Sequence, residues 1–322
     1  MLKYFVKRIM MSILVLFGIT VIVFFLIHWA PGDPIQAMYN NIPGMTQEQI
    51  DAKKASMGLD KPVPVQYVMY MKNLFKGDLG MSIQYNRPVL DLIGERVWNT
   101  FGLTFAALLL SILLAIPVGV LSATKKYSAF DYIVTTLAFV GISIPSFFFG
   151  FILIKIFAVD LGWFPTAGMQ TAGNTFTGLD KIMDIAWHGA LPVTVLALIN
   201  MASYTRYVRS SILDVIRQDY IRTARAKGLK EKVVIYKHAL RNGLIPVVTI
   251  IGSSLAYLFS GSLITETIFS WPGLGKMIYG ATTARDYYVM MGINIFVAVL
   301  VVLGQLLSDA LLVLVDPRIK FK

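Results

Sequence analysis

The residue types that carry out most enzyme chemistry are scarce in this chain. It has no cysteine, and its three histidines, His28, His188 and His238, lie far apart in the sequence. Thiolate catalysis, disulfide bonds and cysteine-ligated zinc are therefore excluded. A glycine-rich lysine motif, PGLGKM at 272–277, lacks the Gly-x-x-x-x-Gly-Lys-Ser/Thr spacing of a phosphate-binding loop. We therefore expect no catalytic residue, no metal site and no cofactor bound by this chain.

The clearest pattern lies in a basic segment, 206–243, which holds ten Lys and Arg against three acidic residues. Apolar residues recur there every four positions and predict one helical face: Ile212, Ile216, Tyr220 and Ala224. Gly228 then predicts the end of that helix. A second apolar stripe follows: Val233, Tyr236, Leu240 and Leu244. The segment is predicted to form a helix, a glycine turn and a helix, with small residues at the bend.

Three interpretations of the basic segment compete. A helix-turn-helix that reads DNA uses basic residues in this way, but apolar runs flank the segment on both sides and keep it from a duplex. A basic loop that only sets membrane topology explains the charge. It does not explain why Ala224, Ala226 and Gly228 gather at the turn. Small residues let another backbone come close, which favours a docking site for a cytoplasmic protein.

The elements that position this segment are predicted to be membrane-spanning helices. The chain has 322 residues, of which 56% are hydrophobic and only 15% charged, whereas soluble domains are about 25% charged. A span needs about 20 apolar residues. Six runs approach that length: 9–29, 100–122, 133–158, 187–205, 244–265 and 289–314. We therefore expect an all-α polytopic membrane protein with a six-span core at about 95–314.

The distribution of charge orients these spans. Four segments lie on the side of the N-terminus: 1–8, 123–132, 206–243 and 315–322. They hold 18 of the 29 Lys and Arg but only five acidic residues, so the positive-inside rule predicts that both termini are cytoplasmic. The external segments are 30–99, 159–186 and 266–288. The first of these predicts a short helix capped by Thr46 and an amphipathic helix near 65–76.

The basic segment resembles the cytoplasmic "EAA" loop of ABC importer permeases. Aligned on Gly228, it has RTA at 222–224, with Arg222 in place of the glutamate, and HALR at 238–241; the proline comes five residues late, at Pro246. Similarity to the dipeptide, oligopeptide and nickel permeases, of the B type, extends along most of the chain. It includes these motifs: PGDP (31–34), GLDKPVPVQY (58–67), GDLGMS (77–82), YTRYVRSSIL (204–213), ETIFSWPGLG (266–275) and DPR (316–318).

This resemblance implies a type I ABC importer permease fold in a bacterial or archaeal cell membrane, and the following partners. They are a second homologous permease, two ATPase subunits that bind ATP and Mg²⁺, an extracellular or periplasmic substrate-binding protein, and a peptide substrate. No nucleic acid is expected. The implied ATPase-coupling residues are Tyr220, Arg222, Thr223, Ala224, Ala226, Lys227, Gly228, Leu229, His238 and Arg241.

Two further sets of residues are candidates for the transport path. Asn200, Ser203 and Tyr204 lie within about one turn of each other on the fourth predicted span and are candidates for a wet pathway. The resemblance implies an external gate at Glu266, Pro272, Gly273 and Gly275, and a plain helix-capping turn within SWPGLGKMIYG (270–280) is the alternative. Relatives take dipeptides, oligopeptides, nickel chelates or glutathione, and the sequence leaves these open.

An ion-coupled secondary transporter needs ion-binding residues at the midplane and inverted repeats, and an intramembrane enzyme needs a nucleophile and base; neither pattern is present.

Overall fold

The computed structural model describes residues 2–29, 35 and 46–315. The PGDP motif (31–34) and the DPR motif (316–318) lie outside the described residues. All the regular elements within those residues are helices, and Met81 and Pro88 form an isolated antiparallel bridge. The predicted helical class is therefore confirmed for the described chain.

Four helices are long and apolar enough to cross a membrane. They are α1 (Leu2–Trp29), α5 (Val89–Thr124), α8 (Gly178–Ile216) and α15 (Tyr287–Val315). They contain the first, second, fourth and sixth predicted spans. The mean hydropathy over 18 residues of these helices lies between 1.7 and 2.9. Helices of this length and composition are stable in the hydrocarbon core of a bilayer.

The third predicted span is a bent pair. α6 (Ala129–Ser143) is followed by α7 (Ser146–Leu153), which continues into a π-helical turn, η1 (Ile154–Asp160). The chain bends by 104° between α6 and the segment formed by α7 and η1. Pro145 lies at the bend and forms the N-cap of α7. Since the residue before a proline avoids the helical region, Ile144 is extended, with ψ 125°. The pair is one broken span or a re-entrant loop.

The fifth predicted span, 244–265, is divided in the structure. α12 (Ile245–Leu255) has 11 residues, and turns separate it from α13 (Leu263–Ile268). Neither helix alone has the length of a span. Within the described residues four helices, or five with the bent pair, qualify as spans, and the six-span count stays a prediction.

The centre of the molecule is the packing of α5 against α8. Gly119 of α5 lets the two backbones approach, because a Cβ at this position would lie 2.7 Å from Cβ of Val208. Val120 and Ala123 of α5 pack with Val208 and Ile212 of α8 in a buried cluster. Small residues at such contacts are what bring helices together in lipid, where apolar burial gives little driving force.

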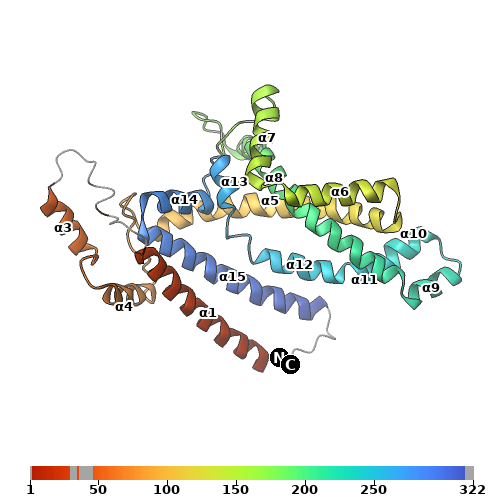
Figure 1. Ribbon diagram of the computed structural model, residues 1–322, viewed down its shortest axis with the longest axis horizontal. Helices are drawn as coiled ribbons and strands as arrows, with labels where there is room; N and C mark the ends of the chain where they lie inside the picture. The colour runs from red at the N-terminus through yellow and green to blue at the C-terminus, as the bar shows by residue number, and fades with distance from the viewer. Residues whose placement is uncertain (1, 30–34, 36–45, 316–322) are drawn as a thin grey trace.

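The remaining helices mark the two ends of the molecule. α3 (Gln47–Ser56) begins at Thr46 in a capping box with Gln49, and α4 (Val63–Leu74) follows, so both predicted external helices are present. Figure 1 shows α3, α4 and α14 (Leu274–Ala284) at one end of the long helices, with α9 (Asp219–Ala226) and α10 (Glu231–Val233) at the other.

Candidate functional site

The basic segment forms a small folded unit beyond the end of α8. α8 ends at Ile216, and α9 (Asp219–Ala226) begins after Gln218. Gly228 has φ +75°, a left-handed conformation that favours glycine. Three short helices follow: α10 (Glu231–Val233), η2 (Val234–Ala239) and α11 (Leu240–Gly243). The predicted helix, glycine turn and helix are confirmed, with a π-helical turn, η2, in the second half.

The predicted first stripe was wrong, because the chain bends between α8 and α9. Gln218 is extended, with ψ 150°, so Ile212 and Ile216 do not share a helical face with Tyr220. On α9 the buried side chains are Ile221 and Ala224, at 0% and 6% exposed, while Tyr220 is 42% exposed.

The second stripe was wrong at Val233 and Tyr236 and right at Leu240 and Leu244, which pack against the buried cluster of α5 and α8. Val233 and Tyr236 are 38% and 60% exposed, whereas the neighbouring Val234 and Ile235 are 0% and 4% exposed. The π turn η2 adds a residue per turn and shifts the buried side by one position. Aromatic and branched side chains that the sequence assigned to the interior therefore face outward.

The unit has an apolar core of its own. Ile221 and Ala224 of α9 pack on Val234 and Ala239 of η2, with Val215 and Ile216 of α8 beneath them. Arg225 and Glu231 form an ion pair across the Gly228 turn, with Nη2–Oε1 2.6 Å and Nε–Oε2 3.1 Å. The Arg225 guanidinium holds the pKa of the Glu231 carboxyl below its ordinary value. These contacts fix α9 against η2 as one body.

Most of the predicted coupling residues lie on the outside of this body. The exposed ones are Tyr220, Arg222, Thr223, Ala226, Lys227, Gly228, Leu229 and Arg241. His238 is half-buried, and Ala224 lies inside, against Val234 and Ala239. All ten residues therefore belong to this unit. Eight are exposed on its surface, His238 is half-buried, and Ala224 lies in its core.

The unit is joined rigidly to the long helices. Ser211 of α8 donates to the carbonyl of Gly243 at 2.6 Å, and Asn242 donates to the hydroxyl of Tyr220 at 3.0 Å. Gly243 lies against Ile212, since a Cβ at this position would be 2.5 Å from Cδ1 of Ile212. Ile235 of η2 also packs in one buried cluster with Ile212 of α8 and Val247 of α12, so the unit contacts both helices.

A buried ion pair near this unit was missed at the sequence level. Asp131, at the start of α6 and 3% exposed, accepts from Arg209 of α8 at 2.6 and 2.8 Å. Asp131 also accepts from the hydroxyl of Ser122 and from the backbone N–H of Tyr127 at 2.9 Å. The hydroxyl of Ser128 accepts from the backbone N–H of Asp131 and caps α6. A serine three residues before an aspartate can indicate such a cap in the sequence, but no sequence pattern identifies Arg209 as the partner of Asp131. The pair ties α5, α6 and α8 together.

A cavity of about 310 Å³ lies between α5, α8 and the broken α12 region. Asn200 and Tyr204 line it, as predicted for the wet pathway, whereas Ser203 does not. Its other polar lining side chains were missed: Thr104, Ser254, Tyr257 and Ser262. The Tyr204 hydroxyl is 2.8 Å from Oγ of Ser254. The lining has hydroxyl and amide groups but no Asp, Glu, Lys or Arg, so it suits neutral hydrogen-bonding groups.

The four predicted gate residues are brought together beside Asn99 and Thr100, in the N-terminal third of α5. Glu266 is 0% exposed and accepts from the hydroxyl of Thr100 at 3.0 Å and the backbone N–H of Lys276 at 3.1 Å. Lys276 lies in the first turn of α14, so the carboxylate caps that helix. Burial raises the pKa of the Glu266 carboxyl, and these donors oppose that effect.

Glycines make room for this carboxylate. A Cβ at Gly273 would lie 2.4 Å from Oε2 of Glu266, and one at Gly275 would lie 2.9 Å from the same atom. The carbonyl of Pro272 accepts from Asn99 at 2.9 Å. The ETIFSWPGLG motif therefore forms a tightly packed turn that joins α5, α13 and α14. Lys276, the lysine of PGLGKM, donates its backbone N–H to the carboxylate of Glu266.

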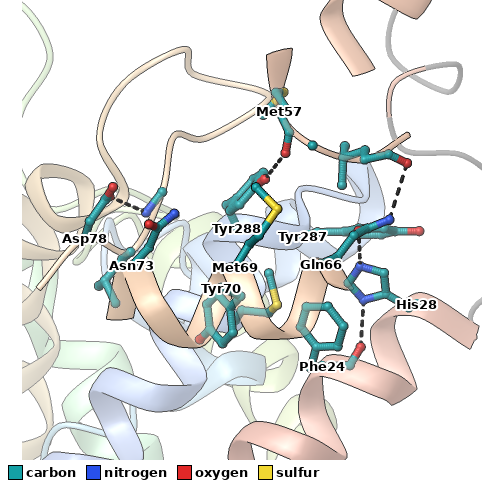
Figure 2. A pocket seen from close by; sticks show the side chains of 15 residues that line it. Phe24, His28, Met57, Gln66, Met69, Tyr70, Asn73, Asp78, Tyr287 and Tyr288 are labelled. Atoms are coloured by element: carbon teal, nitrogen blue, oxygen red, sulfur yellow. Dashed lines mark hydrogen bonds between the residues drawn. The ribbon is translucent and has the colours of Figure 1, made fainter. Parts of the chain in front are cut away.

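The external segment is fastened to the ends of α1 and α15. Figure 2 shows His28 between the carbonyl of Phe24, at 2.8 Å, and the side chain of Gln66, at 3.1 Å, while Tyr288 donates to the carbonyl of Met57 at 2.8 Å. The cavity among these residues has about 50 Å³, room for one or two water molecules. It is a packing contact between segments and is too small for a peptide.

No group of three or more His, Asp or Glu side chains within the described residues could hold a metal ion. The polar side chains of the sites described above form hydrogen bonds and ion pairs within the chain.

Two family models match the chain. The model described as "Binding-protein-dependent transport system inner membrane component" matches residues 115–321. The model described as "Binding-prot-dependent transport system membrane comp, N-term" matches residues 1–104. The second match includes α1 and the segment 30–99, with Asn99, Thr100 and Thr104 of α5. The first includes the basic unit, Glu266 and the α8 and α12 side of the cavity.

Several curated proteins are similar over their whole length. The oligopeptide transport system permease protein AppB of Bacillus subtilis (strain 168) is 45% identical over 322 residues, 100% of each chain. The dipeptide transport system permease protein DppB of Escherichia coli (strain K12) is 39% identical over 339 residues, 100% of each chain. The glutathione transport system permease protein GsiC of Pectobacterium atrosepticum is 37% identical over 323 residues.

A solved structure supports the fold. A chain of the MetNI methionine ABC transporter, in an inward-facing conformation, aligns with TM-score 0.55 and 21% identity over 70% of this chain and 96% of that chain. At that identity the likeness concerns the fold alone. Together with the two family models and the full-length relatives, it leads to one conclusion: this chain belongs to the family of binding-protein-dependent transport system inner membrane components, the permeases of ABC importers.

Proposed function

We propose that this chain is the permease subunit of an ATP-driven importer of peptides. Its relatives are named for oligopeptide, dipeptide and glutathione transport, and all three substrates are peptides or peptide-like. The observation that carries the proposal is the unit formed by 217–243. It has its own core, it is joined to α8 and α12, and it presents apolar and cationic side chains to solvent. An ATPase subunit that grips such a unit moves the helices around the cavity.

The proposal includes the assembly. The chain pairs with a second permease, and each permease docks on one of two ATPase subunits through its basic unit. The excess of Lys and Arg over acids in 1–8, 123–132, 206–243 and 315–322 supports both termini being cytoplasmic. In the proposal the fifth span is 244–265, formed by α12 and the turns that follow it, and 159–186 and 266–288 are external, where a substrate-binding protein delivers its cargo.

The lining of the 310 Å³ cavity supports peptides as substrates. Peptide backbones carry amide donors and acceptors, and Asn200, Tyr204 and Ser254 supply matching neutral groups. Soft side chains that would bind a metal are absent from this lining, which disfavours a nickel-chelate carrier. Glutathione, a tripeptide, remains the second candidate because of the 37% identity to a glutathione permease.

A nutritional test separates these possibilities. A leucine auxotroph without its own peptide permeases would express this chain with its four partner proteins, and uptake of labelled tri-leucine and glutathione would be measured. We expect tri-leucine uptake that stops when ATP is depleted with arsenate and continues when a protonophore removes the ion gradient. Uptake abolished by the protonophore at normal ATP would instead support an ion-coupled carrier.

A further inference from the structure

A groove between α6 and α8 has no role in the mechanism proposed above. Its larger part is a cavity of about 360 Å³ whose walls are apolar side chains of both helices, together with Val118 of α5 and Thr205. A second cavity, of about 180 Å³, shares Val134, Ala138 and Thr205 with the first. The two form one slot that runs from the bend after α6 toward the cytoplasmic end of α8.

The polarity of the slot changes along its length. The end beside Ile144 and Phe149 is apolar, whereas the other end is lined by Arg206 and Arg209. Arg209 is paired with Asp131. Arg206 is exposed, lies over the ring of Tyr207 at 5.8 Å, and has no carboxylate partner among the residues that the structure describes. The slot therefore has an apolar interior and a cation at its mouth.

A buried hydroxyl lies where the two parts of the slot meet. Thr205 is 3% exposed, and its Oγ1 has no hydrogen-bond partner within the described residues. Most threonines in membrane helices donate to a carbonyl one turn earlier, as Thr194 does to Ala190 at 2.7 Å. An unpaired buried hydroxyl destabilises the protein, so a ligand atom that accepts a hydrogen bond from Thr205 would be favoured there.

We infer that this slot binds an anionic phospholipid of the cytoplasmic leaflet. One acyl chain lies between α6 and α8, an ester oxygen accepts from Thr205, and the phosphate lies at Arg206. The neighbouring surface supports lipid as the occupant, since Ile133, Leu137 and Val140 of α6 are 59%, 62% and 46% exposed. A helix of a second permease, about 10–12 Å across, can cover the slot but cannot enter it.

The position of the slot gives the lipid a consequence. It lies beside the Asp131–Arg209 pair, which joins α6 to α8 a short distance before the basic unit. A chain held in the slot fixes the spacing of α6 and α8, the same two helices that this pair connects. The proposal concerns a ligand of the membrane itself and stands independently of which substrate is carried.

Native mass spectrometry of the transporter, purified in mild detergent with its partner subunits, tests the proposal. We expect one tightly held phospholipid in the wild type. Ala138→Trp fills both parts of the slot and should release that lipid. Thr136→Trp adds the same bulk on an exposed position of α6 that lines neither part, and it should retain the lipid. Equal lipid retention in both tryptophan variants would overturn the slot as the site.

A second arm tests the headgroup and does not depend on the tryptophan variant folding. In exchange against phosphatidylglycerol or phosphatidylcholine vesicles, the wild type should prefer phosphatidylglycerol about fivefold, the effect of one cation near a phosphate. Arg206→Gln should remove the preference, and the matched Arg217→Gln should keep it. A preference unchanged in Arg206→Gln would contradict the assignment.

A third arm identifies a protein occupant. The native chain has no cysteine, so Ala138→Cys provides a single site for a short bifunctional cross-linker. High-yield cross-linking to the second permease, with no retained phospholipid, would show that protein covers the slot and would refute the lipid site. Cross-linking to a thiol-reactive lipid would support it.

Discussion

Substitution of Gly228 tests whether the basic unit docks on another protein or only anchors the chain by charge. Gly228 has φ +75°, and a Cβ built there meets nothing within 4 Å in this chain. Any effect of a side chain therefore comes from backbone strain or from a partner. For an L-residue the left-handed conformation costs about 1–2 kcal/mol, and more for a β-branched one.

The expected magnitudes follow an order. Gly228→Asn should be nearly neutral, because asparagine adopts this conformation readily. Gly228→Ala should reduce the folded-to-unfolded ratio of the unit about 5–30-fold, the factor that 1–2 kcal/mol represents. Gly228→Val should reduce it further. None of the three changes the charge of the segment, so an electrostatic anchor would be unaffected by all of them.

The assay compares membrane level, co-purified ATPase and peptide uptake for the three variants. Gly162→Val is a matched control, since Gly162 has φ +63° and open space around its Cβ but lies between η1 and α8, in a segment predicted to be external. It should bind the ATPase normally. Full uptake in Gly228→Val together with a strong loss in Arg217→Glu would refute the docking argument and leave the electrostatic anchor.

Three further perturbations address the other parts of the structure. Asp131→Asn should lower stability by about 2–4 kcal/mol, because it leaves the partly exposed Arg209 without its counter-charge; thermal unfolding of the purified complex measures this against Arg217→Gln. Glu266→Ala should lower stability by about 1–3 kcal/mol for each donor left unpaired, whereas Glu95→Ala, which removes an exposed ion pair with Arg87, should change the melting temperature little. Single cysteines at Lys53 or Asp180 should react with an impermeant maleimide in intact cells and one at Lys230 should not; labelling of position 230 from outside would overturn the orientation.

The parts of the fold that the sequence predicted rest on strong local signals. Long apolar runs identified α1, α5, α8 and α15, because nothing but lipid or a buried core accommodates such helices. Thr46 identified the start of α3, and Gly228 identified the turn of the basic unit. Each of these depends on residues within a few positions of one another.

The errors arose where contacts between distant segments decide the structure. A spacing of four residues predicted stripes through Tyr220 and Tyr236, but the bend at Gln218 and the π turn η2 rotate those side chains outward. The partner of Asp131 lies 78 positions away in the sequence, at Arg209. A single sequence does not show which distant residues are in contact, so the ion pair could not be predicted from it.

The broken fifth span and the polar cavity have one cause. Ser253 and Ser254 lie in the last turn of α12, Gly261 and Ser262 follow the turns after it, and Gly261 adopts φ +75°. A carbonyl freed from a helix must find another donor in a membrane, and that of Leu258 accepts from the hydroxyl of Thr104 at 2.6 Å. Irregular backbone is tolerated at membrane depth where it lines a cavity or is buried in protein. Ser254, Gly261 and Ser262 also line the 310 Å³ cavity. The same polar and flexible residues therefore weaken the apolar run and line the proposed pathway, and hydropathy alone could not distinguish such a span from a weak one.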